Sequence, residues 1–227
     1  MRSFPAQWLT VLLCLGVLHS PLQAREPDLE VGEEINDVCA GCHGEFGEGG
    51  KQGEYPRLAG QPAEYLARQL YLFRDRRLLN LAMVEHVDKR QTTDEDIQDI
   101  SAYLAAIELP AKLAPVDENA PGFNALARLE AAKRVLQIPR VDGDLDAGRK
   151  LYKRECASCH GREGMGDAAD AVPMLAGQYT KYLKKQVQKY LDGVRIHDPD
   201  APEDRLLAAF SEDELHNIFA YVSTLDD

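Results

Sequence analysis

Two short stretches decide the fold of this 227-residue chain: Cys39-Ala40-Gly41-Cys42-His43-Gly44 and Cys156-Ala157-Ser158-Cys159-His160-Gly161. Both contain Cys-x-x-Cys-His, the attachment sequence of c-type haem. Two thiols three positions apart lie on one side of a helical turn and can each bond a vinyl-derived carbon of the porphyrin, and the adjacent histidine then binds the iron. The sequence therefore predicts two covalently bound haem c groups. The expected attachment residues are Cys39, Cys42, Cys156 and Cys159, and the expected axial histidines are His43 and His160.

Other chemistry of paired cysteines fits the sequence less well. A zinc ribbon places its two cysteine pairs about 15–20 residues apart, whereas these pairs begin at Cys39 and Cys156 and each is followed by a histidine. A thioredoxin-like pair requires a βαβ setting, and no run of alternating strand residues is found. Structural disulfides would not require the same tight spacing twice.

The cysteine motifs belong to a longer internal repeat. Further blocks recur in the same order, at an offset of 117 residues that becomes 118 near the end of each copy. These blocks are Leu58-Ala59-Gly60-Gln61 with Leu175-Ala176-Gly177-Gln178, Tyr65-Leu66 with Tyr182-Leu183, and Ala102-Tyr103-Leu104 with Ala220-Tyr221-Val222. The repeat indicates a duplicated domain of roughly 85 residues. A domain of this size has a thin core, so we expect the haem to supply much of it and the apoprotein to be poorly folded.

The N-terminal segment 1–24 has the pattern of a secretory signal peptide. Arg2 supplies the positive charge, residues 8–18 are apolar, and the segment ends on the small residue Ala24. The apolar run is shorter than the 20 or so residues of a membrane span. We therefore expect this segment to be removed and the mature protein to act in the periplasm, with a first domain at 25–110, a connector at 111–143 and a second domain at 144–227.

Each copy is expected to be all-α. Val31, Ile35 and Val38 have helical spacing in a segment that ends near Gly44. The last helix of each copy begins at a polar cap, Thr93 with Asp96 and Ser211 with Glu214. One face of this helix is apolar; its residues are Ile97, Ile100, Leu104 and Ile107 in the first copy and Leu215, Ile218, Phe219 and Val222 in the second. In the connector, 124–137 is a candidate short helix; we interpret the connector as ordered and packed on the domains, with a loose tether as the alternative.

The charge of the chain argues against binding to nucleic acid. Lys and Arg number 26 against 38 Asp and Glu, for a net charge of −12, which is unfavourable for gripping phosphate backbones. Four lysines of the second copy gather on one expected helix: Lys181, Lys184, Lys185 and Lys189. They are either a solvated helix face or a surface that steers a redox partner.

On the cysteine motifs, the repeated Leu-Ala-Gly-Gln blocks and the closing helices with Ala-Tyr, the chain resembles the dihaem class I cytochromes c of the cytochrome c4 type. The resemblance covers both copies, 31–109 and 144–225, although the connector is longer than is usual in that family. It implies two tandem class I cytochrome c domains and electron transfer in the periplasm, with membrane complexes, oxidases or dehydrogenases as partners. It also implies a methionine as the second axial ligand of each iron.

The second axial ligands are less well determined by the sequence. In the first copy Met83 is the only methionine before the last helix, and His86 competes with it. In the second copy no methionine follows Leu175. His197 is the nearest residue of ligand type there; the alternatives are an iron without a protein ligand on that side, or Met174 or Met165.

We therefore expect a periplasmic dihaem cytochrome that passes single electrons between redox proteins and has no catalytic residues of its own. The rival hypothesis is a haem subunit of a periplasmic oxidoreductase, or an enzyme or sensor whose second iron is open or lacks a methionine. Peripheral association with a membrane stays open at this point, and the sequence does not determine the oligomeric state.

Overall fold

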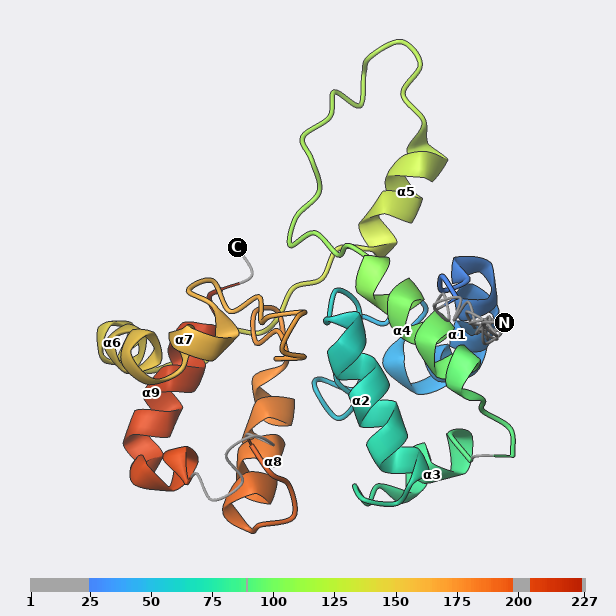
Figure 1. The fold of residues 1–227 in the computed structure, drawn as a ribbon. Coiled ribbons are helices and arrows are strands. Elements are labelled where there is room, and N and C mark those ends of the chain that lie inside the picture. The colour runs from blue at the N-terminus through green and yellow to red at the C-terminus, as the bar shows by residue number, and fades with distance from the viewer. Residues whose placement is uncertain (1–24, 89, 198–204, 226–227) are drawn as a thin grey trace, which may run out of the picture.

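The computed structural model describes residues 25–88, 90–197 and 205–225, so the expected signal peptide at 1–24 lies outside the described part. Within that part the fold is all-α, with two isolated β-bridges, Gly50 with Tyr55 and Asp167 with Val172, and no longer strand (Figure 1). The first copy contains α1 (Leu29–His43), α2 (Ala63–Arg74), α3 (Leu81–His86) and α4 (Asp94–Ala106). The connector contains α5 (Ala125–Lys133). The second copy contains α6 (Leu145–Glu155), α7 (Ala157–His160), α8 (Thr180–Leu191), the 3₁₀ helix η1 (Leu206–Ala209) and α9 (Glu212–Val222).

In each copy the first and last helices cross at a glycine. α1 packs against α4, and α6 packs against α9. A Cβ atom on Gly32 of α1 would lie 2.5 Å from the carbonyl oxygen of Asp99, and one on Gly148 of α6 would lie closer still to the carbonyl oxygen of Asn217. The helix backbones therefore approach so closely that only glycine is accommodated at these two positions.

The buried side of α1 differs from the expected one. Val31 and Ile35 are half-buried, but Val38 is 64% exposed, whereas Gly32 and Asn36 are buried. The helix was predicted correctly, but its contact face is set by the glycine crossing rather than by the largest apolar side chains.

The predicted starts of the last helices are confirmed. Thr93 accepts a hydrogen bond from the backbone N–H of Asp96 at 3.0 Å, and the carboxylate of Asp96 accepts one from the backbone N–H of Thr93 at 2.7 Å. Ser211 and Glu214 form the same reciprocal pair at the start of α9. Each capping box satisfies two N–H groups that the helix itself leaves unpaired.

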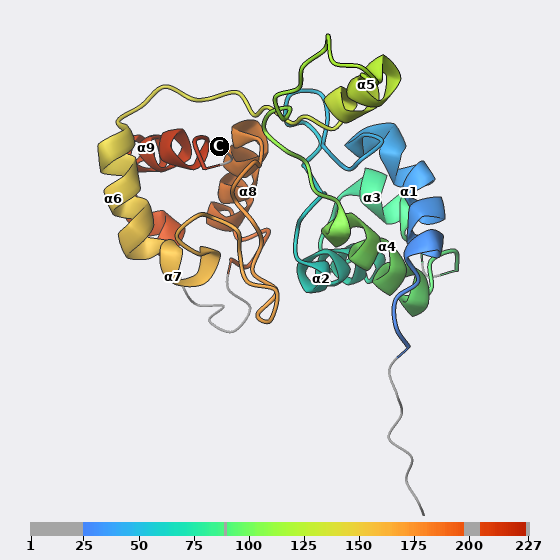
Figure 2. The same ribbon diagram turned by 90° about the horizontal axis from the view of Figure 1, so that it is seen from above.

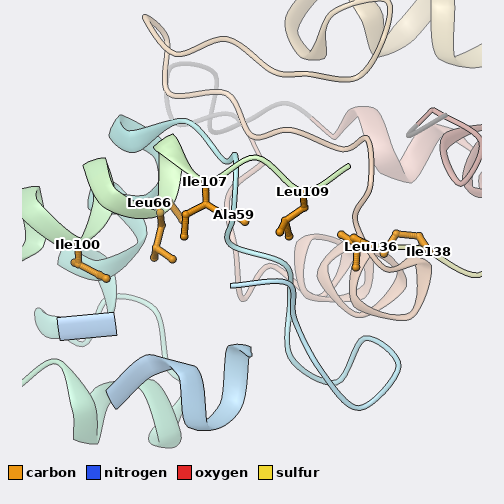
Figure 3. Packing of buried hydrophobic residues seen from close by; sticks show 8 residues of the cluster. Ala59, Leu66, Ile100, Ile107, Leu109, Leu136 and Ile138 are labelled. Atoms are coloured by element: carbon orange, nitrogen blue, oxygen red, sulfur yellow. The ribbon is translucent and has the colours of Figure 1, made fainter. Parts of the chain in front are cut away.

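The core of the first copy extends into the connector. Figure 3 shows Leu136 and Ile138 in one cluster with Leu109 and with residues of the first domain. The other buried members are Ala59, Leu66, Ile100, Leu104 and Ile107. The end of the connector is therefore packed on the first domain, as expected of an ordered connector.

The middle of the connector is different. Asn124 caps α5 by accepting a hydrogen bond from the backbone N–H of Ala127, but Leu126 and Leu129 are 66% and 57% exposed. Figures 1 and 2 show α5 and its loop projecting beyond the helices of the two copies. The interpretation that the connector packs on the domains therefore does not hold for the leucines of α5.

The two copies meet through a reciprocal pair of glutamines, which we call the glutamine clamp. Gln61 donates to the carbonyl oxygen of Met174 and accepts from its N–H, both at 2.9 Å. Gln178 in turn donates to the carbonyl oxygen of Arg57 at 2.9 Å and accepts from its N–H at 3.0 Å. Residues 57 and 174, and residues 61 and 178, are related by the repeat offset, so the contact has an approximate twofold symmetry.

Two of the four lysines of α8 form ion pairs across this interface. Lys181 and Lys185 both pair with Glu54 of the first copy, at 3.3 and 2.6 Å. Lys184 instead lies over the ring of Phe219, 5.9 Å from its centroid. The lysines of α8 are therefore not one free surface, because two of them hold the copies together.

Candidate haem sites

The four motif cysteines lie at helix ends and form no disulfide with one another. Cys39 and Cys42 lie in the last turns of α1, and Cys156 and Cys159 lie at the junction of α6 with α7 and within α7. In each pair the first cysteine is half-buried and the second is exposed. Burial raises the pKa of Cys39, and it raises the pKa of Cys156 to about 11. Each pair therefore offers one inner and one outer sulfur to a planar group at the surface of its domain.

The two motif histidines are held in one orientation. Nδ1 of His43 lies 3.0 Å from the carbonyl oxygen of Pro56, and Nδ1 of His160 lies 2.9 Å from that of Pro173. A carbonyl can only accept, so Nδ1 carries the proton and Nε2 is left with its lone pair. Burial also lowers the pKa of both rings, which favours the neutral form that binds a metal.

A glycine-containing loop positions the carbonyl that holds each histidine. Gly47 has φ of +67°, and its carbonyl oxygen accepts from the N–H of Leu58 at 2.7 Å. Gly164 has φ of +72° and accepts in the same way from Leu175. Only glycine takes up this left-handed backbone readily, so the loop between histidine and proline makes the same turn at Gly47 and at Gly164.

In the second copy a further histidine lies near the motif histidine. The ring centroids of His160 and His197 are 6.1 Å apart, with 46° between the ring planes. Two imidazoles on opposite sides of one metal ion, with bonds of about 2 Å, would have their centroids roughly 6 Å apart, so this separation is compatible with both rings binding one ion. The ring of Tyr190 stands edge-on against His197 at 5.2 Å and 89°, so that His197 is supported from α8.

The first copy has no matching pair of histidine rings among its described residues. The ring contact of His43 is with Tyr55, at 6.0 Å and 63°. Met83 lies half-buried in the middle of α3, and His86 is exposed at the end of that helix.

The other two methionines considered for the second haem lie elsewhere. Met174 follows Pro173, whose carbonyl holds the motif histidine, and it is 2% exposed with its backbone in the glutamine clamp. A Cβ atom on Gly60 of the first copy would lie 3.7 Å from Cε of Met174, which places its side chain against that copy. Met165 is 57% exposed.

These residues fit the haem group that the motifs predict. Each copy offers two free thiols and a buried neutral imidazole with an available Nε2, which is the donor set for covalent attachment and iron binding. Elsewhere in the described chain, His, Cys, Asp and Glu form no group of three or more that could hold a metal ion. No described helix is both long and apolar enough to cross a membrane.

The family model for cytochrome c matches residues 30–108 and 145–226. The chain belongs to the cytochrome c family. The two matched segments coincide with the two copies, so the protein has two cytochrome c domains, each with a covalently bound haem, and it is an electron-transfer protein.

Relatives and solved structures narrow the family further. The chain is 34% identical to a thiosulfate dehydrogenase electron acceptor of Stutzerimonas stutzeri, over 83% of this chain and 79% of the relative. It is 28% identical to a cytochrome c4 of Pseudomonas aeruginosa, over 96% and 97% of the two chains. The crystal structure of cytochrome c4 from Pseudomonas stutzeri has the same fold, with a TM-score of 0.67, 24% identity and coverage of 87% and 98%. The protein is therefore a dihaem cytochrome that is similar to cytochrome c4.

A further solved structure contains the fold within a longer chain. It is the thiosulfate dehydrogenase TsdBA of Marichromatium purpuratum, with a TM-score of 0.62 and 30% identity. The match covers 87% of this chain but only 40% of that one.

Three features of the site were not predicted from the sequence. They are the proline carbonyls that orient the motif histidines, the edge-on support of His197 by Tyr190, and the glutamine clamp. The signal for the clamp was present, because its glutamines end the repeated Leu-Ala-Gly-Gln block.

Proposed function

We propose that the protein is a periplasmic electron carrier that receives electrons from a dehydrogenase and delivers them to an oxidase or another membrane complex. Bound haem supplies the one-electron chemistry. The observation that carries the proposal is the pair of haem sites, each with two motif cysteines and a histidine held by a proline carbonyl, in two domains joined by the glutamine clamp. The domain limits that we propose are 25–110 and 144–227, with 111–143 as the connector between them.

The proposed iron ligands differ between the domains. We assign His43 and Met83 to the first iron and His160 and His197 to the second. The separation of 6.1 Å between the rings of His160 and His197 supports the second assignment. His/Met ligation raises the reduction potential of a haem, so electrons would enter at the second domain and leave from the first.

Substitution of His197 by Ala tests the second assignment. Loss of an axial imidazole should convert the second haem from low-spin to high-spin and allow the reduced protein to bind carbon monoxide. His216→Ala is the matched control, because His216 is exposed on α9 of the same domain and its loss should leave both spectra unchanged. A parent protein that already binds carbon monoxide at the second haem would refute the assignment and support the rival function, an enzyme or sensor with an open iron.

The donor that we propose is a thiosulfate dehydrogenase. A relative at 34% identity is described as the electron acceptor of that enzyme, and a thiosulfate dehydrogenase structure contains this fold. The test is stopped-flow reduction of the oxidised cytochrome by a purified thiosulfate dehydrogenase with thiosulfate. Reduction within the turnover time of the enzyme supports this donor, and reduction no faster than with thiosulfate alone refutes it.

A further inference from the structure

Arg195 lies just beyond the C-terminal end of α8, at the contact between the two domains. Its Nη1 donates to the side-chain oxygen of Gln186 in the same domain, and its Nη2 donates to that of Gln69 on α2, both at 2.6 Å. The guanidinium also lies over the ring of Tyr190, 5.0 Å from the centroid. The group is therefore fixed in position from both domains.

This fixed cation has no carboxylate partner in the described part of the chain. A guanidinium stays protonated, and Arg195 is half-buried. None of the ion pairs among residues 25–88, 90–197 and 205–225 includes it. Its hydrogen-bond partners there are the side-chain amides of Gln186 and Gln69 and the hydroxyl groups of Tyr65 and Tyr182. Burial raises the pKa of Tyr182 and of Tyr190, so both side chains are uncharged near neutral pH. A half-buried cation held by neutral groups gains more from an anionic partner than a cation in water does.

The cation is peculiar to the second domain. In the first domain the N–H groups of Arg77 and Leu78 both donate to the carbonyl oxygen of Leu72; in the second, those of Val194 and Arg195 both donate to that of Lys189. The turns are therefore equivalent, and Leu78, which is buried, occupies the position of Arg195. A positive charge replaces an apolar side chain at one of two matching positions, so the fold itself does not require it.

The surroundings of Arg195 connect it to the second haem site. The ring of Tyr190 contacts both the guanidinium and, edge-on, the ring of His197, which faces His160. Haem carries two propionate carboxylates on the porphyrin edge away from the thioether-bonded carbons. Arginine binds a carboxylate through two parallel N–H groups, a stronger contact than a bond between neutral groups.

We propose that Arg195 binds a propionate carboxylate of the second haem and, through Gln69, attaches that edge of the haem to the first domain. Arg195 is then a positioning residue that also sets the potential of this haem. A nearby positive charge disfavours the oxidised iron, which carries the larger charge. This inference goes beyond the proposed function and is independent of which enzyme donates electrons.

The test is redox titration of the haem-loaded protein by visible spectroscopy. Arg195→Gln should lower the ratio of reduced to oxidised second haem about tenfold at a fixed ambient potential, equivalent to about 59 mV for one electron. Arg195→Lys keeps the positive charge but not the planar guanidinium group, so the reduction potential of the second haem should stay close to that of the parent. The matched control is Arg162→Gln, because Arg162 is exposed and lies two residues from His160, as Arg195 lies two residues from His197; its removal should have little effect because solvent screens it.

A second variant separates charge from structure. Gln69→Ala removes the hydrogen bond between the domains but leaves the guanidinium, so it should weaken the interface without lowering the potential. The proposal is overturned if Arg195→Gln leaves the reduction potential of the second haem unchanged or shifts only that of the first haem. It is also overturned if Gln69→Ala lowers the potential of the second haem as much as Arg195→Gln does.

Discussion

The glutamine clamp makes a quantitative prediction for Gln61→Ala. The Gln61 side chain satisfies both the N–H and the C=O of Met174 at 2.9 Å, and Met174 is 2% exposed, so water cannot replace the lost partner. Each buried group left unpaired costs about 1–3 kcal/mol, and two groups give a loss of about 3 kcal/mol at the interface. Because each 1.4 kcal/mol is a factor of ten, the amide of Met174 should exchange with solvent about a hundredfold faster.

The assay is amide hydrogen exchange by NMR on the haem-loaded, reduced protein, with urea unfolding in parallel. Gln178→Ala should have a smaller effect, because its partner Arg57 is only half-buried and water can reach part of it. Gln91→Ala is the control, since Gln91 is exposed and its N–H is engaged through the backbone. The reasoning is wrong if Met174 exchanges in Gln61→Ala at the rate found in Gln91→Ala.

Three further predictions concern the single domains. Gly148→Ala should destabilise the second domain in urea unfolding by about 2–3 kcal/mol through overpacking, whereas Gly41→Ala, with nothing within 4 Å of the added atom, should not. Burial alone would raise the pKa of Asp99, but hydrogen bonds from Arg25 and from the N–H of Asp28 lower it below its ordinary value. The ionised carboxylate therefore stabilises the folded protein at pH values above the unfolded carboxyl pKa of about 3.9. This contribution to the unfolding free energy is lost as the pH falls through the lower pKa of the folded state. The difference in unfolding free energy between parent and Asp99→Asn should therefore shrink as the solution is acidified below that range, and a constant difference would count against the pairing. Protein made without haem should give weak, poorly dispersed amide signals in NMR, and a well-dispersed spectrum would contradict a haem-dependent core.

The fold could be predicted because the sequence signals for its helices and haem sites are local and occur in both copies of the repeat. The paired cysteines, the capping residues Thr93 and Ser211, and the apolar positions of the last helices depend on neighbours within one or two turns. Ile97, Ile100 and Leu104 are buried as expected. These features need no knowledge of what another part of the chain does.

The errors arise where distant segments meet. Val38 was expected to share a face with Val31 and Ile35, but the crossing at Gly32 turns that side of α1 outward. The lysines of α8 were treated as one group, although Glu54, more than a hundred residues away in the chain, pairs with only two of them. Periodicity describes one helix and holds no information about the partner that selects its buried side.

The iron ligands illustrate the same limit. His43 and His160 follow directly from their motifs, and the structure shows their Nε2 atoms available. His197 lies 37 residues beyond His160 and outside any motif, so only the three-dimensional arrangement brings the two rings to 6.1 Å. His197 as an iron ligand is therefore tested by the His197→Ala experiment, and Met83 stays a prediction.

Each glutamine of the clamp hydrogen-bonds to the backbone of a residue in the other domain rather than to its side chain, so the contact does not depend on which side chain that residue carries. Arg57 and Met174 occupy equivalent places yet share no chemistry, and the seam accommodates both. A single unit that carried both the glutamine and the backbone edge would be self-complementary, because two identical copies would supply both halves of the contact.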